Sequence, residues 1–312
     1  RADVMTGEEA KGPRGQEAKR PRIAITVGDP AGIGPEIAAK AAADPSVLAV
    51  CEPVVFAPPA SASVRPGHVS AEAGRAAYDT IVRAVDAARS GDVDAIATAP
   101  VNKLAFAKAG LPWKGHTDLL AHLCGTADVA MMFHSPQLKV VLLTVHVPVR
   151  DVASLLTPSL VDRTIALTVE SLHRFGIARP RLALAGLNPH AGESGVIGSE
   201  DDEVLTPAVE RARAQGIDVT GPIPGDTVFV RASRGEFDCV IACYHDQGLI
   251  PVKLLAFGQA VNVTIGLPIV RTSVDHGTAF DIAGKGVADP GSMIAAVKLA
   301  AQLRTPRDGG HA

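Results

Sequence analysis

The sequence predicts an α/β fold with a largely parallel central sheet, on two observations. Short, near-continuous apolar runs rich in Val, Ile, Leu and Ala recur along the chain, as is typical of strands covered on both faces. Helical stretches follow these runs, and this alternation indicates β-α-β crossovers. The predicted strands are 22–27, 53–57, 94–99, 139–145, 181–186, 238–243 and 260–266.

Between these runs lie the predicted helices, which read most clearly at 72–91, 159–176 and 291–304. Residues 1–20 are polar and charged without apolar periodicity, so we expect a disordered tail and a fold that begins at Pro21. The segment 58–70 is rich in Pro and Ser and is expected to be a loop.

The composition excludes several classes of protein. The 312 residues are 47% hydrophobic and 20% charged, with a net charge of −3 and 4% aromatic residues, which argues against nucleic acid as the main partner. No apolar run approaches the roughly 20 residues that span a bilayer. The four cysteines form no CxxC pair, and Cys239 and Cys243 should face the same side of a strand inside the core. The cytoplasm is the expected compartment.

Three predicted strands end close to a histidine. His146 follows 139–145, His190 follows 181–186 and His245 follows 238–243. Ligands of open α/β sheets bind at the carboxyl ends of strands, and three imidazoles with an open position are typical of a catalytic divalent metal site. Their spacing matches no local zinc motif, so three unrelated loop histidines remain an alternative.

Other polar segments leave two interpretations open. GDPAGIGPE (28–36) is neither a dinucleotide fingerprint nor a Walker loop, and it is either an anion-binding loop or a tight turn. In GHTD (115–118), Thr117 or Asp118 is expected to cap a helix, and His116 could contact a phosphate or carboxylate. Residues 275–290 either wrap a cofactor or form a structural turn.

Three charged or polar residues after the third histidine are also candidates for ligand binding. Lys253 lies in an apolar run, and Asn262 and Arg271 lie in and after the last predicted strand. Each is either a substrate-binding residue or a solvated surface residue. For Arg271, binding is plausible because arginine holds phosphate and carboxylate groups with two parallel hydrogen bonds.

These motifs together resemble those of the 4-hydroxythreonine-4-phosphate dehydrogenase family. The similar segments are ITVGDPAGIGPEI, TAPVNK, GHTD, LNPHAGESG, GDTVF, CYHDQGLIPVK and VNVTIGLP with VRTSVDHGTAFDIAGKG, between about residues 21 and 302. The resemblance implies a two-domain fold of the isopropylmalate dehydrogenase type, with 21–125 plus 262–312 in one domain and 126–261 in the other. It also implies a homodimer with a shared active site in the cleft between the domains.

The resemblance assigns roles to individual residues. His146, His190 and His245 match metal ligands (Zn, Mg or Co), one of them from the partner subunit. The substrate-binding positions are His116, Thr117, Lys253, Asn262 and Arg271. The segment that contains Gly277, Thr278, Asp281 and Gly284 is similar to the one that wraps the adenosine of NAD or NADP. A catalytic role falls to Lys253, with Asp226 or Asp246 as the general base; a carboxylate beside a metal ligand is as often an orienting group as a base.

The implied reaction is NAD-dependent oxidation and decarboxylation of 4-phosphooxy-L-threonine in pyridoxine biosynthesis. Within the family, D-threonate or D-erythronate 4-phosphate and a carboxylated aromatic cis-dihydrodiol are alternative substrates. A non-catalytic metal- or nucleotide-binding protein is the alternative from another class. The chain departs from the resemblance in one place, because relatives usually carry some tens of residues more between the second strand and the helix that starts near Ser70.

Overall fold

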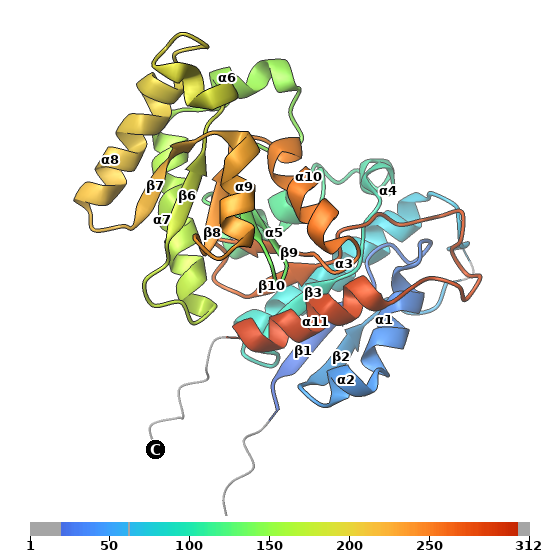
Figure 1. Ribbon diagram of the computed structural model, residues 1–312. Coiled ribbons are helices and arrows are strands. Elements are labelled where there is room, and N and C mark those ends of the chain that lie inside the picture. The colour runs from blue at the N-terminus through green and yellow to red at the C-terminus, as the bar shows by residue number, and fades with distance from the viewer. Residues whose placement is uncertain (1–19, 62, 305–312) are drawn as a thin grey trace, which may run out of the picture.

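The computed structural model describes residues 20–61 and 63–304, and it confirms the α/β fold. One ten-stranded, mostly parallel sheet runs through the molecule with helices on both faces (Figure 1). The expected tail lies outside the described residues, except for Arg20.

The strands agree with the seven predicted runs and add three more. The predicted strands are β1 (Arg22–Thr26), β2 (Glu52–Phe56), β3 (Ala95–Thr98), β5 (Lys139–Leu142), β6 (Leu182–Ala185), β8 (Cys239–Ala242) and β9 (Val261–Ile265). Three strands were not predicted from the sequence, namely β4 (Ala130–His134), β7 (Val219–Ile223) and β10 (Arg271–Ser273).

The helices include the three that the sequence predicted most clearly, α3, α7 and α11. The α-helices are α1 (Gly34–Ala42), α2 (Pro45–Leu48), α3 (Ala71–Arg89), α4 (Lys103–Lys108), α5 (His116–Cys124), α6 (Val152–Leu155), α7 (Pro158–Arg174), α8 (Thr206–Ala214), α9 (Gly225–Ser233), α10 (His245–Ala256) and α11 (Gly291–Leu303). Three short helical turns are η1 (Val149–Asp151), η2 (Pro189–Glu193) and η3 (Asp201–Leu205).

Two strands interrupt the parallel arrangement. β9 is antiparallel to β10 on one side and to β4 on the other, and β4 is antiparallel to β5. The sheet order is β2-β1-β3-β10-β9-β4-β5-β8-β6-β7. The strands are parallel within each flanking group, β2-β1-β3-β10 and β5-β8-β6-β7, but the two groups run in opposite directions. The carboxyl ends of β5, β8 and β6 therefore meet at one edge.

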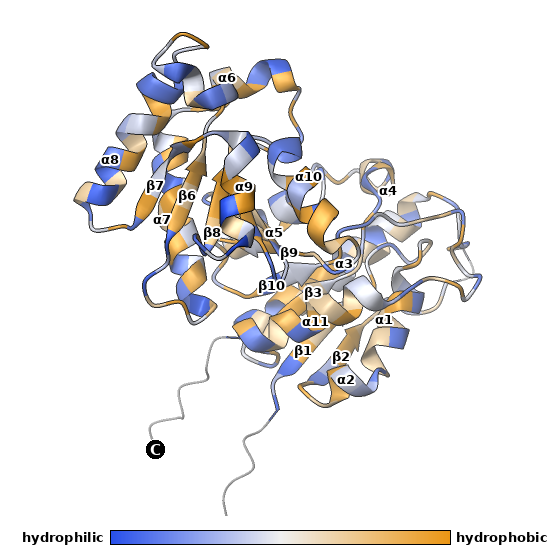
Figure 2. Cartoon of the chain, viewed as in Figure 1, coloured by the Kyte–Doolittle hydropathy of each residue, from blue (hydrophilic) through white to orange (hydrophobic). Residues whose placement is uncertain are grey.

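The core is built by alternation along each strand. Ile23 and Ile25 of β1 pack toward α1 and α11, whereas Ala24 packs toward α3. Figure 2 shows β6, β7 and β8 as hydrophobic arrows between helices of mixed character. Cys239, which opens β8, and Cys243, which directly follows it, are buried in the same apolar cluster, and all four cysteines are free.

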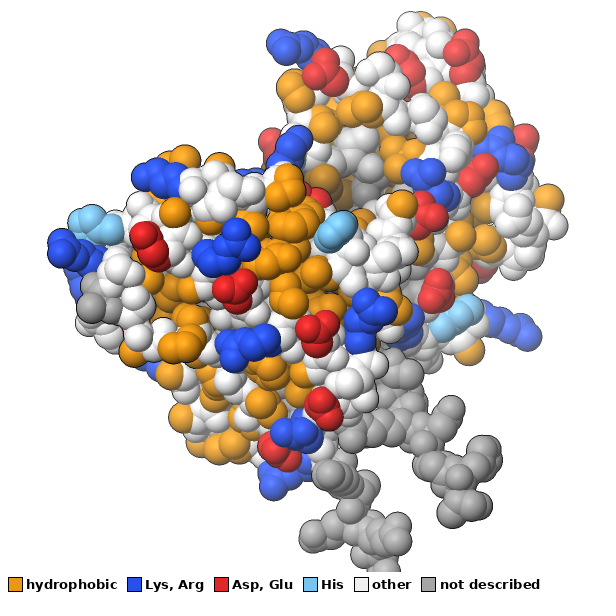
Figure 3. Space-filling model, turned by 180° about the vertical axis from the view of Figure 1, so that it is seen from behind, with side chains coloured by type: hydrophobic (Ala, Val, Ile, Leu, Met, Phe, Trp, Pro, Cys, Tyr) orange, Lys and Arg blue, Asp and Glu red, His pale blue; other side chains and the backbone are white. Residues whose placement is uncertain are grey.

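The surface shows no large field of one sign on the face seen in Figure 3, where acidic and basic side chains are interspersed. Among the described residues, no single helix has both the length and the apolar character that would let it cross a membrane.

Candidate active site

Three adjacent parallel strands carry the predicted metal ligands to one edge of the sheet. His146, His190 and His245 lie three to five residues beyond the ends of β5, β6 and β8, respectively. Because β8 pairs with both β5 and β6, the three histidines follow neighbouring strands. The sequence predicted only that each would follow the carboxyl end of a strand.

Two of the three histidines lie together. The ring centroids of His146 and His245 are 5.7 Å apart. Burial, with Lys103 and His245 nearby, lowers the pKa of His146. A neutral imidazole is the form that binds a metal, so this pKa shift favours coordination at neutral pH.

His245 opens α10 and is oriented by its neighbour. Its Nδ1 atom lies 2.7 Å from Oδ1 of Asp246, which leaves Nε2 as the nitrogen that can face a ligand. Such a carboxylate–histidine pair fixes the orientation of a ligating ring. The geometry therefore places the carboxylate of Asp246 where it can orient the His245 ring.

His190 stands apart from this pair. It is exposed, with Nδ1 3.5 Å from Oε2 of Glu193. Within residues 20–61 and 63–304, no group of three or more His, Cys, Asp or Glu side chains is placed to hold a metal ion. One chain thus brings His146 and His245 together without His190.

Gln247 connects the segments that follow β6 and β8, and it was not predicted as a site residue from the sequence. Its Oε1 accepts a hydrogen bond from the backbone N–H of Cys243 at 2.7 Å, and its Nε2 donates to the carbonyl of Gly186 at 2.7 Å. The start of α10 is thereby tied to the end of β6. The position of Gln247, two residues after His245, is the feature of the sequence that could have pointed to it.

A cavity of about 710 Å³ lies beside His146. Its polar lining is mostly cationic or neutral, with one carboxylate, from Asp118. The polar and charged lining residues are Lys103, Lys114, His116, Thr117, Asp118, His146, Asn262, Arg271, Ser273 and His276. Four of the five predicted substrate-binding residues therefore line one cavity.

Arg271 is the most unusual of these side chains, because it is only 2% exposed. Its Nη1 donates to Oγ1 of Thr264 at 2.8 Å and its Nη2 to Oγ1 of Thr98 at 2.7 Å. Its Nε has no partner, and among the described residues no carboxylate forms an ion pair with it. Burial lowers its pKa to about 9, so the guanidinium stays charged at neutral pH.

His116 and Asn262 carry further buried polar atoms without partners, Nε2 and Oδ1. Burial and the nearby Arg271 hold the pKa of His116 well below its usual range, so the ring is neutral. A buried polar group without a hydrogen bond costs about 1–3 kcal/mol, so this arrangement favours a polar ligand that completes the site. Asp118, the third residue of α5, accepts a hydrogen bond of 2.9 Å from the backbone N–H of Gly115. It therefore caps the start of α5, although the N-cap residue is Gly115.

The glycine loop before α1 proves to be a tight turn. The N–H groups of Asp29, Ala31, Gly32 and Ile33 all donate within the protein. A Cβ atom at Gly34 would lie 1.8 Å from the carbonyl oxygen of Val27, so only glycine fits there. Since these donors are occupied, the loop has few free N–H groups for an anion.

The expected cofactor segment packs directly on this glycine turn. The carbonyl of Thr278 accepts from the N–H of Ile33 at 3.0 Å, and Gly284 has a φ of +75°. Gly277 lines the cavity, and Asp281 is exposed. Segment 277–284 is thus a turn held against the rim of the cavity.

Two predicted catalytic residues lie elsewhere on this chain. Lys253 is exposed on α10 and Asp226 is exposed in the first turn of α9, and neither lines the cavity. Within one chain, they are not brought to Arg271.

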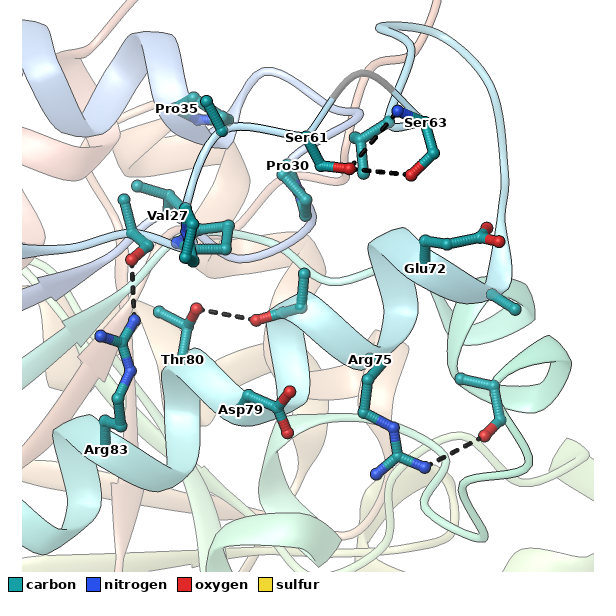
Figure 4. A pocket seen from close by; sticks show the side chains of 18 of the residues that line it. Val27, Pro30, Pro35, Ser61, Ser63, Glu72, Arg75, Asp79, Thr80 and Arg83 are labelled. Carbon is teal, nitrogen blue, oxygen red and sulfur yellow. Dashed lines mark hydrogen bonds between the residues drawn. The ribbon is translucent and has the colours of Figure 1, made fainter.

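A second hollow, of about 1040 Å³, lies between residues 57–61, 63 and 64, the glycine turn and α3 (Figure 4). Pro30, Pro35 and Thr80 line it, together with Arg75 and Arg83, which donate to backbone carbonyls. Although larger, it contains neither a histidine nor a buried polar atom without a partner, so the chemistry points to the smaller cavity.

The family follows from comparison with known proteins. Residues 23–300 match the model of the pyridoxal phosphate biosynthetic protein PdxA. The chain belongs to the PdxA family. It is 46% identical to 4-hydroxythreonine-4-phosphate dehydrogenase of Desulforapulum autotrophicum, with 92% of this chain and 96% of the relative covered. It is 45% identical to D-threonate 4-phosphate dehydrogenase of Cupriavidus necator, with 92% and 98% covered.

Solved structures support the same family assignment. A 4-hydroxythreonine-4-phosphate dehydrogenase from Klebsiella pneumoniae has a TM-score of 0.84 at 42% identity, with 91% of this chain and 99% of that chain covered. A terephthalate 1,2-cis-dihydrodiol dehydrogenase from Burkholderia xenovorans has a TM-score of 0.67 at 34% identity, with 91% and 98% covered. This PdxA-family chain is an oxidoreductase that acts on a CH–OH group.

One relative contains residues that have no counterpart in this chain. The alignment with the Desulforapulum protein spans 327 positions, more than the 312 residues of this chain, so the relative carries residues without a counterpart here.

Proposed function

We propose that the 710 Å³ cavity binds a phosphorylated hydroxy acid, which the protein oxidises and decarboxylates with NAD. The proposed substrate is 4-phosphooxy-L-threonine, and the products are 3-amino-2-oxopropyl phosphate and CO2. The observation that carries the proposal is the buried guanidinium of Arg271, which has a free Nε and no carboxylate partner among the described residues. A phosphate or carboxylate would complete its hydrogen bonds and balance its charge.

The residues that would hold a divalent ion fit that role. His146 and His245 present two imidazoles at 5.7 Å between centroids, and imidazole suits Zn²⁺ or Co²⁺ better than Mg²⁺. A bound ion would lower the pKa of the substrate hydroxyl and stabilise negative charge as CO2 leaves, while NAD or NADP would accept the hydride.

The chain's own residues would bind and orient the substrate. Arg271 and His116 would hold an anionic group, and Asn262 and Thr117 would fix its orientation by hydrogen bonds. Segment 277–284, with Gly277, Thr278, Asp281 and Gly284, would hold the dinucleotide at the rim of the cavity. Asp246 would keep the His245 ring in place, which leaves Asp226 as the candidate for accepting a proton.

A homodimer would complete the site. His190, Lys253 and Asp226 lie outside the cavity of their own chain, so we propose that they act in the site of the partner chain. An apolar surface formed by α10 and the residue that directly follows it supports this arrangement, because four large side chains are 44–82% exposed there. They are Ile250, Leu254, Leu255 and Phe257. Exposed apolar patches of this kind are typical of subunit interfaces.

Two further parts of the proposal concern organisation. We propose the division into 21–125 plus 262–312 and 126–261, with the cavity between the two parts. The four free cysteines fit a reducing compartment, and we propose the cytoplasm.

The decisive experiment is a substrate panel. The protein is treated with a chelator, supplied again with Zn²⁺ or Co²⁺, and assayed for NADH or NADPH formation with 4-phosphooxy-L-threonine, D-threonate 4-phosphate, D-erythronate 4-phosphate and a terephthalate dihydrodiol. We expect metal-dependent turnover of the first. Higher kcat/KM with D-threonate 4-phosphate would assign the chain to the function named for the Cupriavidus relative. If no substrate turns over while metal and NAD bind, the enzymatic proposal is wrong.

A further inference from the structure

His190 lies on a left-handed turn that ordinary side chains avoid. His190, Ala191, Glu193 and Ser194 have φ angles of 54°, 54°, 44° and 59°, and Gly192 between them has 78°. Each non-glycine residue in this region costs on the order of 1 kcal/mol. Four of them in five positions persist only if the surrounding structure holds the turn in place.

Asp201 supplies that hold. It is fully buried at the start of η3. Its Oδ1 accepts the backbone N–H of Leu187 at 2.8 Å. Its Oδ2 accepts the backbone N–H of Asn188 at 3.1 Å and the side-chain Nδ2 of Asn188 at 3.0 Å. One carboxylate thus binds three donors where β6 ends and the turn begins.

The turn also packs closely around this carboxylate. A Cβ atom at Gly192 would lie 3.3 Å from Cβ of Asp201, and one at Gly186 would lie 3.0 Å from its Oδ1. Glu200 adds a second contact, because its Oε2 accepts from Nδ2 of Asn188 at 2.8 Å. Among the described residues, no lysine or arginine forms an ion pair with Asp201, so the donors of the turn itself balance its charge.

We infer that Asp201 is a positioning residue, which holds the 187–194 turn in the conformation that presents His190 to the metal. The inference rests on the proposed metal site. Groups that hold a metal ligand in place without touching the metal typically contribute 10- to 100-fold to metal affinity or activity. The established family membership does not depend on this role.

The test compares Asp201→Asn with Asp202→Asn. Both remove one charge from adjacent positions, but Asp202 is exposed and makes no hydrogen bond to the turn. Two quantities are measured: the Co²⁺ affinity of chelator-treated protein, followed by visible absorption, and hydrogen–deuterium exchange over 187–194. For Asp201→Asn we expect a Co²⁺ Kd raised about tenfold or more, faster exchange in the turn, and kcat largely restored at saturating Co²⁺.

The two measurements separate the inference from the proposed function. Wild-type Co²⁺ affinity or an unchanged exchange pattern in Asp201→Asn overturns the inference and leaves the metal site standing. Absence of Co²⁺ binding in the wild-type protein overturns both, whatever the exchange shows. If Asp201→Asn fails to fold, Asn188→Ala takes its place: it removes the contacts of Nδ2 and keeps the buried carboxylate, and an unchanged Co²⁺ Kd there also overturns the inference.

Discussion

The imidazole rings of His146 and His245 lie with their centroids 5.7 Å apart and their planes tilted by 40°, just beyond the ends of two strands that pair directly. Val140 is paired with Val240 and Leu142 with Ala242, so the register of the buried sheet sets where each loop leaves. Asp246 then holds the His245 ring, because its Oδ1 atom lies 2.7 Å from Nδ1 of His245. The pair is therefore positioned by the core of the protein and not only by its loops.

Replacing His245 with Ala should abolish metal-dependent turnover. The substitution removes one imidazole from the pair, and the loss of a direct ligand should weaken Co²⁺ binding by about 100-fold or more, at least as much as loss of an orienting group. Calorimetric titration of chelator-treated protein with Co²⁺ measures this. His173→Ala, at an exposed position of α7, is the matched control and should bind as the wild type does. Equal affinity in the two variants would remove His245 from the site.

Arg271 should contribute to substrate binding at the expense of stability. Arg271→Met keeps an apolar body of similar length and removes a buried charge that lacks an ion-pair partner among the described residues, so the midpoint of thermal unfolding should stay the same or rise. KM for the phosphorylated substrate should rise roughly 10- to 100-fold, because hydrogen bonds to a charged group contribute about 1.5–3 kcal/mol.

Arg271→Lys separates charge from geometry. Lysine keeps the positive charge but cannot donate to Thr98 and Thr264 and also bind an anion with two parallel bonds. We expect a KM between those of the wild type and Arg271→Met. A Met variant with wild-type KM would show that the guanidinium faces no substrate anion.

Two of the three strands that the sequence did not predict, β7 and β10, lack a continuous apolar run, whereas the third, β4, is apolar and was missed all the same. β10 consists of Arg271, Thr272 and Ser273, and it is a strand because it pairs with β3 and β9. β7 contains Gly221 and Pro222, which usually break strands. Such segments take their structure from neighbours that lie far away in the sequence.

The same limit applies to the site. The three histidines were visible because each follows an apolar run, and His116 and Arg271 were visible through motifs. Arg271 is buried against Thr98 and Thr264, which lie on two other strands. Its burial and its hydrogen-bond partners could therefore not be predicted from the sequence. Asp201 carried no local signal, because its role depends on N–H groups at the end of β6.

His134 should make the protein less stable as the pH falls below about 6.5. It lies at the end of β4, stacked on Phe175 with the ring centroids 5.1 Å apart. Burial, with Lys139 nearby, lowers its pKa to about 4. Since the unfolded chain keeps a pKa near 6.5, it binds the proton first, and stability falls between about pH 6.5 and pH 4 by roughly 3 kcal/mol at most.

Urea unfolding at several pH values tests this dependence. His134→Gln has no titrating group, so its free energy of unfolding should fall less steeply over the same interval. The exposed His68→Gln is the control and should keep the wild-type slope. Equal slopes in wild type and His134→Gln would mean that another group is responsible.

The apolar surface of α10 should hold two chains together. Leu254 and Phe257 are 82% and 81% exposed, which leaves two large side chains in water unless a second copy covers them. Phe257→Glu should shift the protein toward the monomer in sedimentation velocity, because a carboxylate would be buried without a partner. Leu48→Glu, at a 42% exposed position on α2, should leave the sedimentation coefficient unchanged.

Mixing two inactive variants tests whether the site itself is shared. His190→Ala and His245→Ala should each lack metal-dependent turnover as homodimers. In a heterodimer, one of the two sites would receive His190 from one chain and the His146–His245 pair from the other, and that site would be intact. Co-refolding the two variants should therefore restore part of the NADH production. No recovery in a mixture that forms heterodimers would place all three histidines in one chain, and it would require His190 to move toward the pair when metal binds.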